Sequence, residues 1–272
     1  MNLKGKVALI TGGGRGIGAA IAKRFVADGA RICISDVRKD LLDQVAQSMP
    51  AGTVATCFGD VTKFDDVKKM VDATVKFGGK LDALVNNAGI DPGGSIVDLD
   101  PDLWRKVLDV NLNGPFLCMK AAIPQMIKQG GGSIINIASL AGLRCLPAMP
   151  AYSASKGGLI MLAQQAALDY GPYKVRSNVV CPGGTKTEML VEALSALGKA
   201  IGKDAQGVFD TISANIPLRR LADPDEMTGI CSYLASDDSS FVSGSVILVD
   251  GGAAIVDISG AALTSLGVKW GT

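Results

Sequence analysis

Thr11-Gly12-Gly13-Gly14-Arg15-Gly16-Ile17-Gly18 is the stretch that decides the fold, because it joins a short apolar run to a helical pattern. The apolar run, residues 6–11, is typical of a buried β-strand, and residues 17–28 have the apolar spacing of an amphipathic helix. Glycines permit a tight turn and let backbone N–H groups approach an anion at the positive end of a helix. An ordinary turn is the alternative, but the position between a strand and a helix favours a pyrophosphate-binding loop. Its candidate cofactor-binding residues are Gly12, Arg15, Gly16, Ile17 and Gly18.

Strand-like and helix-like patterns alternate along the rest of the chain. Six further apolar runs are expected to form strands, at residues 31–36, 53–59, 81–86, 133–138, 175–181 and 245–250. The runs are apolar throughout, which indicates that both faces of each strand are buried. Because the alternation continues without a linker, we expect one α/β domain over residues 1–272, a Rossmann-type doubly wound sheet of seven parallel strands.

The composition excludes several classes of protein. The 272 residues include 27 Lys and Arg against 26 Asp and Glu, so no basic excess indicates a nucleic-acid-binding protein. The absence of histidine excludes Ser-His-Asp triads and histidine-ligated metals, and we expect no metal site. The first apolar run is too short for a signal peptide, and no charge-free stretch reaches membrane-spanning length. Six cysteines without a CxxC pair indicate reduced thiols and a cytoplasmic protein.

Asp36 ends the second predicted strand and bears on the choice of cofactor. A carboxylate at that position can accept hydrogen bonds from the ribose hydroxyls of a bound adenosine. A 2′-phosphate there would meet like charge, so Asp36 favours NAD over NADP. Arg15 and Arg38 argue the other way, since either could pair with a phosphate, and a solvated loop carboxylate is the alternative for Asp36. The cost of like charges at close range weighs in favour of NAD.

Polar residues also follow the third and fourth predicted strands. Asp60 and Val61 come after the third, and residues 86–89, Asn-Asn-Ala-Gly, come at the end of the fourth. The carboxyl ends of parallel strands are where open α/β sheets bind ligands. Taken singly, each of these residues could serve only to form a turn.

Tyr152 and Lys156 lie four residues apart at the start of a predicted helix, so their side chains share one face. A nearby ammonium and an oxidised nicotinamide ring would favour phenolate and lower the pKa of Tyr152 from its ordinary value of about 10. Tyr152 would then be a usable acid/base, although an unconnected surface pair is the alternative. Ser139 ends the fifth strand, where it could donate a hydrogen bond to a substrate oxygen or cap a turn.

The helix predicted over residues 100–127 contains a proline. Pro115 has no N–H, so the carbonyl of Asn111, four residues earlier, loses its helical partner. That carbonyl could hold a water that passes protons between the solvent and Lys156, or the helix could simply be kinked.

These residues, in their order and spacing, resemble those of the short-chain dehydrogenase/reductase family over essentially the whole chain. Any one match is weak, whereas the full series is highly specific. The matching residues are Thr11, Gly12, Gly16, Gly18, Asp60, Asn86, Asn87, Ala88, Gly89, Asn111, Ser139, Tyr152, Lys156, Pro182, Gly183 and Thr187. The resemblance implies an NAD-dependent oxidoreductase that transfers hydride between nicotinamide and a secondary alcohol or ketone.

The resemblance further implies a catalytic tetrad of Asn111, Ser139, Tyr152 and Lys156. Tyr152 would transfer the proton, Ser139 would position the substrate oxygen, and Lys156 would hold the nicotinamide ribose and lower the pKa of Tyr152. Asn111 would support the water relay. The other implied cofactor contacts are Asp60 and Val61 at the adenine, Asn87, Ala88 and Gly89 along the cofactor, and the loop of Pro182, Gly183, Thr185 and Thr187 at the nicotinamide carboxamide.

Three segments are expected to surround the substrate: residues 90–96, residues 140–149, and an apolar lid over residues 188–216 whose length favours a bulky or extended substrate. The candidate substrate contacts are Ser139, Leu140, Arg144, Cys145, Met149 and Met189. Arg144 could pair with a substrate anion or be solvated. The family's usual assembly implies a homotetramer or a homodimer, and the apolar tail over residues 253–272 could pack on a neighbouring subunit.

Two alternatives remain open at this point. The first is a reductase of 3-oxoacyl groups carried as thioesters on acyl carrier protein or coenzyme A, from the same family. The second is a non-catalytic, cofactor-binding partner subunit, which the intact tetrad disfavours.

Overall fold

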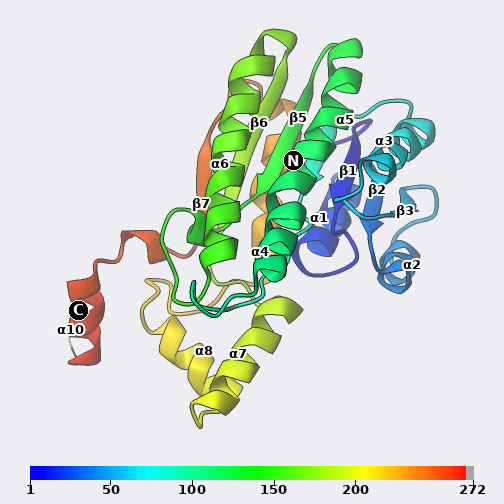
Figure 1. Ribbon diagram of the computed structural model, residues 1–272. Coiled ribbons are helices and arrows are strands. Elements are labelled where there is room, and N and C mark those ends of the chain that lie inside the picture. Colours follow the sequence, from blue (N-terminus) through cyan, green and yellow to red (C-terminus); the bar gives the residue numbers. More distant parts are fainter. Residues whose placement is uncertain (268–272) are drawn as a thin grey trace.

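The computed structural model describes residues 1–267, and within them a seven-stranded parallel sheet lies between two layers of helices (Figure 1). The strand order is β3-β2-β1-β4-β5-β6-β7, and the predicted doubly wound α/β fold is confirmed. The strands are β1 Val7–Thr11, β2 Arg31–Asp36, β3 Val54–Phe58, β4 Ala83–Asn86, β5 Gly132–Ile137, β6 Val175–Pro182 and β7 Val246–Val249. The chain order reverses between β1 and β4, and open α/β sheets bind ligands outside the carboxyl ends of the strands at such a reversal.

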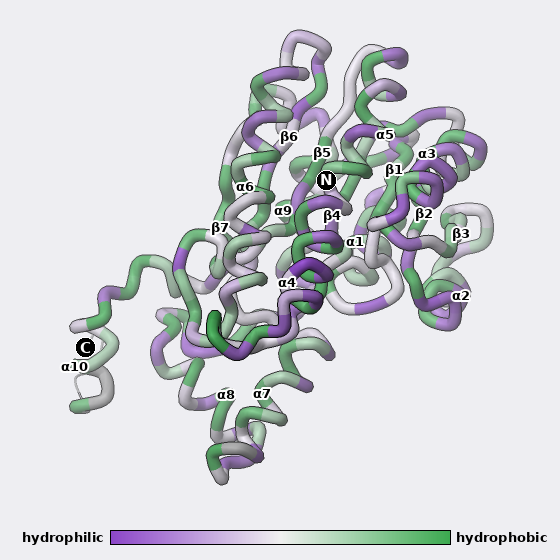
Figure 2. The backbone as a smooth tube through the Cα atoms, viewed as in Figure 1, coloured by the Kyte–Doolittle hydropathy of each residue, from purple (hydrophilic) through white to green (hydrophobic). Residues whose placement is uncertain are grey.

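Helices cover both faces of the sheet. One layer consists of α1 Gly16–Ala27, α2 Lys39–Gln47 and α9 Thr228–Ala235; the other consists of α3 Phe64–Gly78, α5 Gly114–Lys128 and α6 Pro150–Tyr170, with α4 Pro101–Leu108 beside α6. Side chains of each strand alternate between the layers, so that Ile10 packs on the α1 side and Leu9 on the α3 side. Figure 2 shows hydrophobic residues along the strands and hydrophilic residues on α2 and α3.

The two edge strands are less buried than the sequence predicts. Phe58 in β3 is 63% exposed and Leu248 in β7 is 41% exposed. An edge strand has a neighbour on one side only, so the covering helices enclose it less completely. Burial on both faces therefore applies to the five inner strands.

A buried row of polar side chains crosses the centre of the sheet. Asn86 of β4 donates to Asn136 Oδ1 of β5 at 2.9 Å, and Asn136 Nδ2 donates to Ser177 Oγ of β6 at 3.3 Å and to the Asn178 carbonyl at 3.2 Å. These bonds satisfy the amide of Asn136 within the protein, whereas Asn86 Oδ1 is buried without a partner among the described residues. The row links β4, β5 and β6 just below the edge at which the predicted site lies.

The helix predicted over residues 100–127 is not continuous. The structure divides it into α4, a π-helical turn at Asp109–Asn113, and α5. At the end of this turn the Gly114 N–H bonds the Asp109 carbonyl, five residues earlier. Pro115 follows at the start of α5 and cannot donate, and a π turn is one way in which a helix accommodates such a residue. The predicted irregularity is therefore a wider turn that contains Asn111.

Beyond one end of the sheet, α7 Glu188–Ala200 and α8 Ala205–Ser213 occupy the segment that the sequence predicts as a lid (Figure 1), and the lid role stays a prediction. Leu194, Val208, Ile216 and Leu221 form an apolar cluster within it, whereas Leu197 is 47% exposed. The short 3-10 turns are Leu140–Gly142, Gly171–Tyr173, Pro224–Met227, Asp237–Ser239 and Ala253–Ile255.

The C-terminal tail forms one further helix, α10 Ile258–Ser265, which stands apart from the sheet in Figure 1. Residues 268–272, the last part of the predicted tail, lie outside the described residues. Across residues 1–267, every helix falls short of the length or the apolarity that a membrane span requires.

Candidate active site

The glycine-rich turn between β1 and α1 forms a cradle that side chains would fill. Gly12 and Gly16 have φ angles of 63° and 53°, in the left-handed region that favours glycine. A Cβ atom built on Gly18 would lie 2.1 Å from the Gly12 carbonyl oxygen. Within the described residues, Arg15 caps α1 without a side-chain hydrogen bond, and no acidic residue occupies the first turn. The N-terminal N–H groups of α1 are thus open to an anion such as a pyrophosphate.

The predicted residues after β4 hold this cradle in place. Asn87 Nδ2 donates to the carbonyls of Thr11 and Gly12, each at 3.0 Å. The backbone N–H groups of Asn87 and Ala88 donate to Thr11 Oγ1 at 3.1 and 3.2 Å. The ends of β1 and β4 therefore form one rigid unit at the reversal point of the sheet.

Asp36 lies directly beside the glycine-rich turn. Its Oδ2 accepts from the Gly14 N–H at 3.2 Å, and its Oδ1 accepts from the Arg38 N–H at 3.0 Å. The Arg38 guanidinium is turned to Asp40, which it contacts through two hydrogen bonds at 3.0 and 2.7 Å. The carboxylate at the end of β2 thus faces the cradle, while Arg38, one of the two residues that argued for NADP, is paired elsewhere.

The predicted adenine contacts lie at the end of β3. Asp60 Oδ1 accepts from the N–H and the hydroxyl of Thr62 at 2.9 and 2.8 Å, so its orientation is fixed. Val61 is buried against Gly114, where a Cβ atom would lie 2.8 Å from Val61 Cγ2. The Val61 side chain is therefore packed inside the protein, against the start of α5.

Ser139, Tyr152 and Lys156 converge at the carboxyl edge of β5. The Ser139 hydroxyl lies close enough to Tyr152 to lower its pKa, and its oxygen accepts from the Ala141 N–H at 3.1 Å, so it is a turn cap as well. Lys156 Nζ lies 5.6 Å from the centre of the Tyr152 ring and donates to the Ile137 carbonyl at 2.8 Å. A hydroxyl, a phenol and an ammonium thus meet beside the cradle.

Burial shifts the pKa values of both ionisable members of this group. It raises the pKa of Tyr152 to about 12, against the opposing effect of the Ser139 hydrogen bond, and the negative charge of Asp91 adds to the rise. It lowers the pKa of Lys156 to about 8, against the opposing effects of Cys181 and Asp91. The lowered Tyr152 pKa expected from the sequence is therefore not found in the protein alone, because desolvation outweighs the opposing effect of the Ser139 hydroxyl. The sequence argument also relied on the positive charge of an oxidised nicotinamide.

Asn111 joins the group through its side chain, which is fully buried. Asn111 Oδ1 accepts from the Ile90 N–H and its Nδ2 donates to the Ile90 carbonyl, each at 2.9 Å. A Cβ atom built on Gly89 would lie 3.4 Å from Asn111 Oδ1 and 3.5 Å from Lys156 Nζ, so these two polar atoms flank Gly89. The water relay through the Asn111 carbonyl stays a prediction.

The loop after β6 leads into α7 and passes close to the glycine-rich turn. The Gly183 N–H donates to the Val249 carbonyl at 3.0 Å, which places Pro182 and Gly183 at the carboxyl edge, and Thr185 Oγ1 donates to the Gly183 carbonyl at 3.1 Å. Thr187 caps α7 by accepting from the Leu190 N–H at 3.3 Å. A Cβ atom built on Gly16 would lie 3.3 Å from Thr187 Cγ2, so the lid begins directly over the glycine-rich turn.

The predicted substrate contacts are spread over the mouth of the site. Leu140 begins a 3-10 turn, Met149 caps α6, and Met189 is half-buried in the first turn of α7. Arg144 and Cys145 are exposed, and the Arg144 guanidinium donates to the Ala254 carbonyl of the tail at 3.4 Å. The structure thus brings Arg144 to the base of the C-terminal tail.

One charged residue near the tetrad was missed by the sequence argument. Asp91 lies in the predicted substrate segment, and burial raises its pKa, with the charge of Lys156 opposing the rise. Its own charge raises the pKa values of Tyr152 and Lys156. The available signal was its place two residues after Gly89, at the exit of an inner strand.

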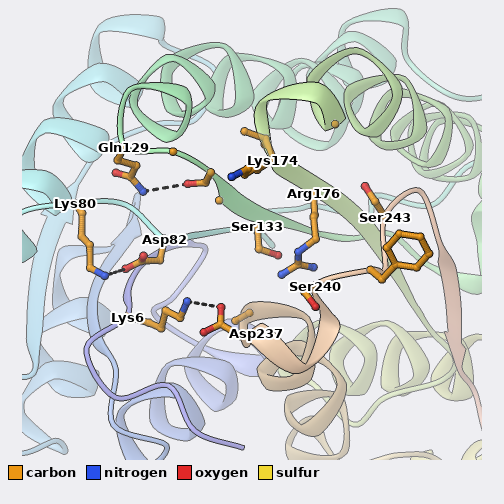
Figure 3. Close-up of a pocket in the computed structure, with 17 residues that line it drawn as sticks. Lys6, Lys80, Asp82, Gln129, Ser133, Lys174, Arg176, Asp237, Ser240 and Ser243 are labelled. Carbon is orange, nitrogen blue, oxygen red and sulfur yellow. Dashed lines mark hydrogen bonds and ion pairs between the residues drawn. The ribbon is translucent and has the colours of Figure 1, made fainter.

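A surface cavity of about 700 Å³ lies at the opposite, amino edge of the sheet (Figure 3). Its charged lining residues are largely paired: Lys6 contacts Asp237 at 2.7 Å and Lys80 contacts Asp82 at 3.0 Å. The Arg176 guanidinium donates to backbone carbonyls of the chain. None of the predicted site residues lines this cavity, which therefore takes no part in the candidate site.

Comparison with known proteins adds to this geometry. A family model described as enoyl-(acyl carrier protein) reductase matches residues 12–254. The meso-2,3-butanediol dehydrogenase of Serratia marcescens is 37% identical over 94% of this chain and 98% of its own length. The 3-oxoacyl-(acyl-carrier-protein) reductase of Thermotoga maritima is 37% identical over 94% of this chain and 100% of its own. The crystal structure of levodione reductase superposes with a TM-score of 0.89 and 30% identity, covering 93% of this chain and 99% of that one.

Proposed function

The chain belongs to the short-chain dehydrogenase/reductase family and is an oxidoreductase that acts on alcohol or ketone groups, and from this premise we propose that it uses NAD and that Tyr152 is its acid/base. The observation that carries the proposal is the convergence of Ser139, Tyr152 and Lys156 beside a glycine cradle at the reversal of the sheet. A secondary alcohol or ketone placed against Ser139 and Tyr152 meets both a proton-transferring group and an orienting hydroxyl.

A bound nicotinamide would supply the hydride acceptor in oxidation and the hydride donor in reduction. The protein's own groups handle the proton. In reduction, the Tyr152 phenol donates its proton to the developing alkoxide while Ser139 holds the same oxygen. In oxidation, Tyr152 must first lose its proton, and the Lys156 ammonium, which is the main form below a pKa of about 8, favours the phenolate.

Four further parts of the chain would hold the dinucleotide. The open N–H groups of α1 suit the pyrophosphate, and the carboxylate of Asp36 suits the two ribose hydroxyls of NAD. The fixed end of β3 at Asp60 suits the adenine, and the loop at Thr185 and Thr187 suits the carboxamide. Asp36 carries the preference for NAD, because a 2′-phosphate would meet its negative charge at close range.

The test is turnover by the purified protein with NAD and with NADP, followed as reduced nicotinamide, on cyclic alcohols, diols, polyols and hydroxy acids. We expect Tyr152→Phe to lower kcat by about 10²- to 10⁴-fold, which is the usual contribution of a positioned acid/base. Tyr173→Phe makes the same chemical change at an exposed tyrosine and should leave kcat unchanged. Full activity in Tyr152→Phe would refute the assigned acid/base.

A second candidate is reduction of 3-oxoacyl thioesters, favoured by the similarity of the chain to the 3-oxoacyl-(acyl-carrier-protein) reductase of Thermotoga maritima. It uses the same four residues, so the discriminating measurement is kcat/KM on 3-oxoacyl thioesters against that on simple ketones, with NADH and with NADPH. A non-catalytic role is disfavoured, because all four tetrad positions are filled and lie together.

We further propose that the protein acts as a homo-oligomer, a tetramer or a dimer, in a reducing compartment such as the cytoplasm. Met161 and Leu168 on α6 are 65% and 72% exposed, and Ile258 of the tail is 88% exposed, an apolar set that a second subunit would cover. The six cysteines are all unpaired, as a reducing compartment requires. Sedimentation of the purified protein as a monomer would exclude the proposed assembly.

A further inference from the structure

Asp91 lies on a backbone segment whose direction is fixed. The preceding residue, Ile90, is held at both its N–H and its carbonyl by the buried side chain of Asn111. Three residues later, the Gly94 N–H donates to the Ala148 carbonyl at 2.8 Å, which joins this segment to the loop that leads into α6. Asp91 is therefore held between two anchored points at the mouth of the site.

Asp91 is half-buried, and one oxygen of its carboxylate is left without a partner. Among the described residues, Asp91 Oδ1 is shielded from solvent and has no hydrogen-bond partner. A buried oxygen of this kind carries an appreciable desolvation cost, and polar atoms left in this way are expected to have a use. A ligand that brings a hydrogen-bond donor would remove the cost.

The groups around Asp91 indicate which kind of donor fits. Its charge acts on Tyr152 and Lys156 of α6, and Cys181 of β6 faces the same two residues as a neutral thiol whose pKa burial raises to about 11. The Lys156 ammonium already supplies one positive charge, so a cationic substrate would meet repulsion. An anionic substrate would be repelled by Asp91 itself. A neutral donor, such as a hydroxyl group, avoids both conflicts.

We propose that Asp91 is a specificity-determining residue that accepts a hydrogen bond from a second hydroxyl group of the substrate, so that vicinal diols and related polyols are preferred over simple secondary alcohols. This inference rests on the proposed function, because the first hydroxyl is the one that Ser139 and Tyr152 hold. Gly89, two residues before Asp91, lies against Lys156 Nζ and Asn111 Oδ1, so the segment that carries Asp91 borders the group that would hold the reacting carbon.

The test compares butane-2,3-diol with butan-2-ol, which differ by one hydroxyl group, as substrates of the full-length protein with NAD. We expect kcat/KM to favour the diol in the wild type, and Asp91→Leu to reduce that preference by about 10- to 100-fold, the usual effect of a hydrogen bond to a charged group. The preference is a ratio for two alcohols measured at one pH, so the effect of Asp91 on the Tyr152 pKa, which both substrates share, cancels from it. Asp91→Asn keeps the shape and loses the charge, so it should give a partial loss and serves if the leucine variant does not fold.

A pH profile separates this role from a structural one. Because Asp91 raises the pKa of Tyr152, both variants should move the acidic limb of kcat/KM for alcohol oxidation to lower pH. Asp98→Leu is the matched control, since Asp98 is an exposed carboxylate on the same connection between β4 and α4. The hydrogen-bond partner of Asp98 is Ser95. It should change neither the diol preference nor the pH profile.

The outcomes distinguish the inference from the proposed function. Equal use of the two alcohols by the wild type, or an unchanged diol preference in both Asp91 variants, would overturn the inference while turnover of butan-2-ol upholds the proposed function. Failure of the wild type to oxidise any alcohol of the panel with either cofactor would overturn both.

Discussion

Gly18→Ala tests the glycine cradle most directly, because the added methyl group has no space. The Cβ atom would lie 2.1 Å from the Gly12 carbonyl oxygen and 2.5 Å from Asn87 Nδ2, well inside contact distance. The backbone of the turn must move, and Asn87 then loses its two 3.0 Å hydrogen bonds to the turn. Overpacking costs about 1–3 kcal/mol, and each lost hydrogen bond costs about 0.5–1.5 kcal/mol. We expect a loss of about 2–6 kcal/mol in the free energy of unfolding.

For a chain of this size, 1 kcal/mol changes the melting temperature by about 2–4 °C, so the variant should melt roughly 4–24 °C lower. The measurement is thermal unfolding with and without NAD, which should stabilise the wild type but not the variant, since the displaced turn is the proposed pyrophosphate site. Gly229→Ala in α9 is the control: its Cβ atom has no neighbour within 4 Å, and it should stabilise by about 0.4–1 kcal/mol. An unaltered melting temperature in Gly18→Ala, with an undiminished response to NAD, would refute the reasoning.

Three further outcomes follow from individual side chains. Asp36→Ala should raise kcat/KM for NADP relative to NAD by about 10- to 100-fold, because the repelling carboxylate is gone; an unchanged ratio with both cofactors would count against Asp36 as the selector. Lys156→Met should abolish turnover but raise the free energy of unfolding near pH 7, because the buried ammonium is costly in the wild type. This gain in stability should shrink as pH rises from about 8 to 10.5, because the wild-type lysine, with its pKa lowered to about 8, loses its proton in the folded state before it does so in the unfolded state. Melting curves across that pH range measure the gain. Asp82→Ala should lower the free energy of unfolding by about 1–3 kcal/mol, because the Asp82 carboxylate accepts a hydrogen bond from the first N–H of β1 at 2.7 Å. Asp65→Ala, which removes an exposed ion pair, should change the free energy of unfolding by less than about 1 kcal/mol. Denaturant titration of the two variants compares these values.

The parts of the fold and site that the sequence predicted are those fixed by local chemistry. Apolar runs located all seven strands, and the glycines located the turn, because a side chain at Gly12 or Gly18 conflicts with the backbone next to it. The four-residue spacing of Tyr152 and Lys156 placed both side chains on one helical face. Such features depend on a few neighbouring residues, so a single sequence contains the information.

Features that depend on distant contacts were not predicted. The contact of Thr187 with Gly16 joins the lid to the glycine-rich turn, and nothing in either segment indicates the other. The pKa of Tyr152 is raised chiefly by burial under several elements, which the sequence argument left out when it considered only Lys156 and the nicotinamide ring. Half-exposure of β3 and β7 likewise follows from strand order, which apolar runs do not specify.

Pro115 connects the two kinds of feature. From the sequence it predicts a break in helical hydrogen bonding at Asn111, and the structure has a π turn there. The consequence for the site comes through the Asn111 side chain, which holds Ile90 at both backbone groups and so fixes the residue that follows, Asp91. A helix irregularity that one proline makes predictable thus sets the position of a carboxylate whose importance no local pattern reveals. Asn111 and Ile90, which these hydrogen bonds join, are 21 positions apart in the chain. Only the folded arrangement therefore shows that Asn111 and the segment of Asp91 belong to the same site.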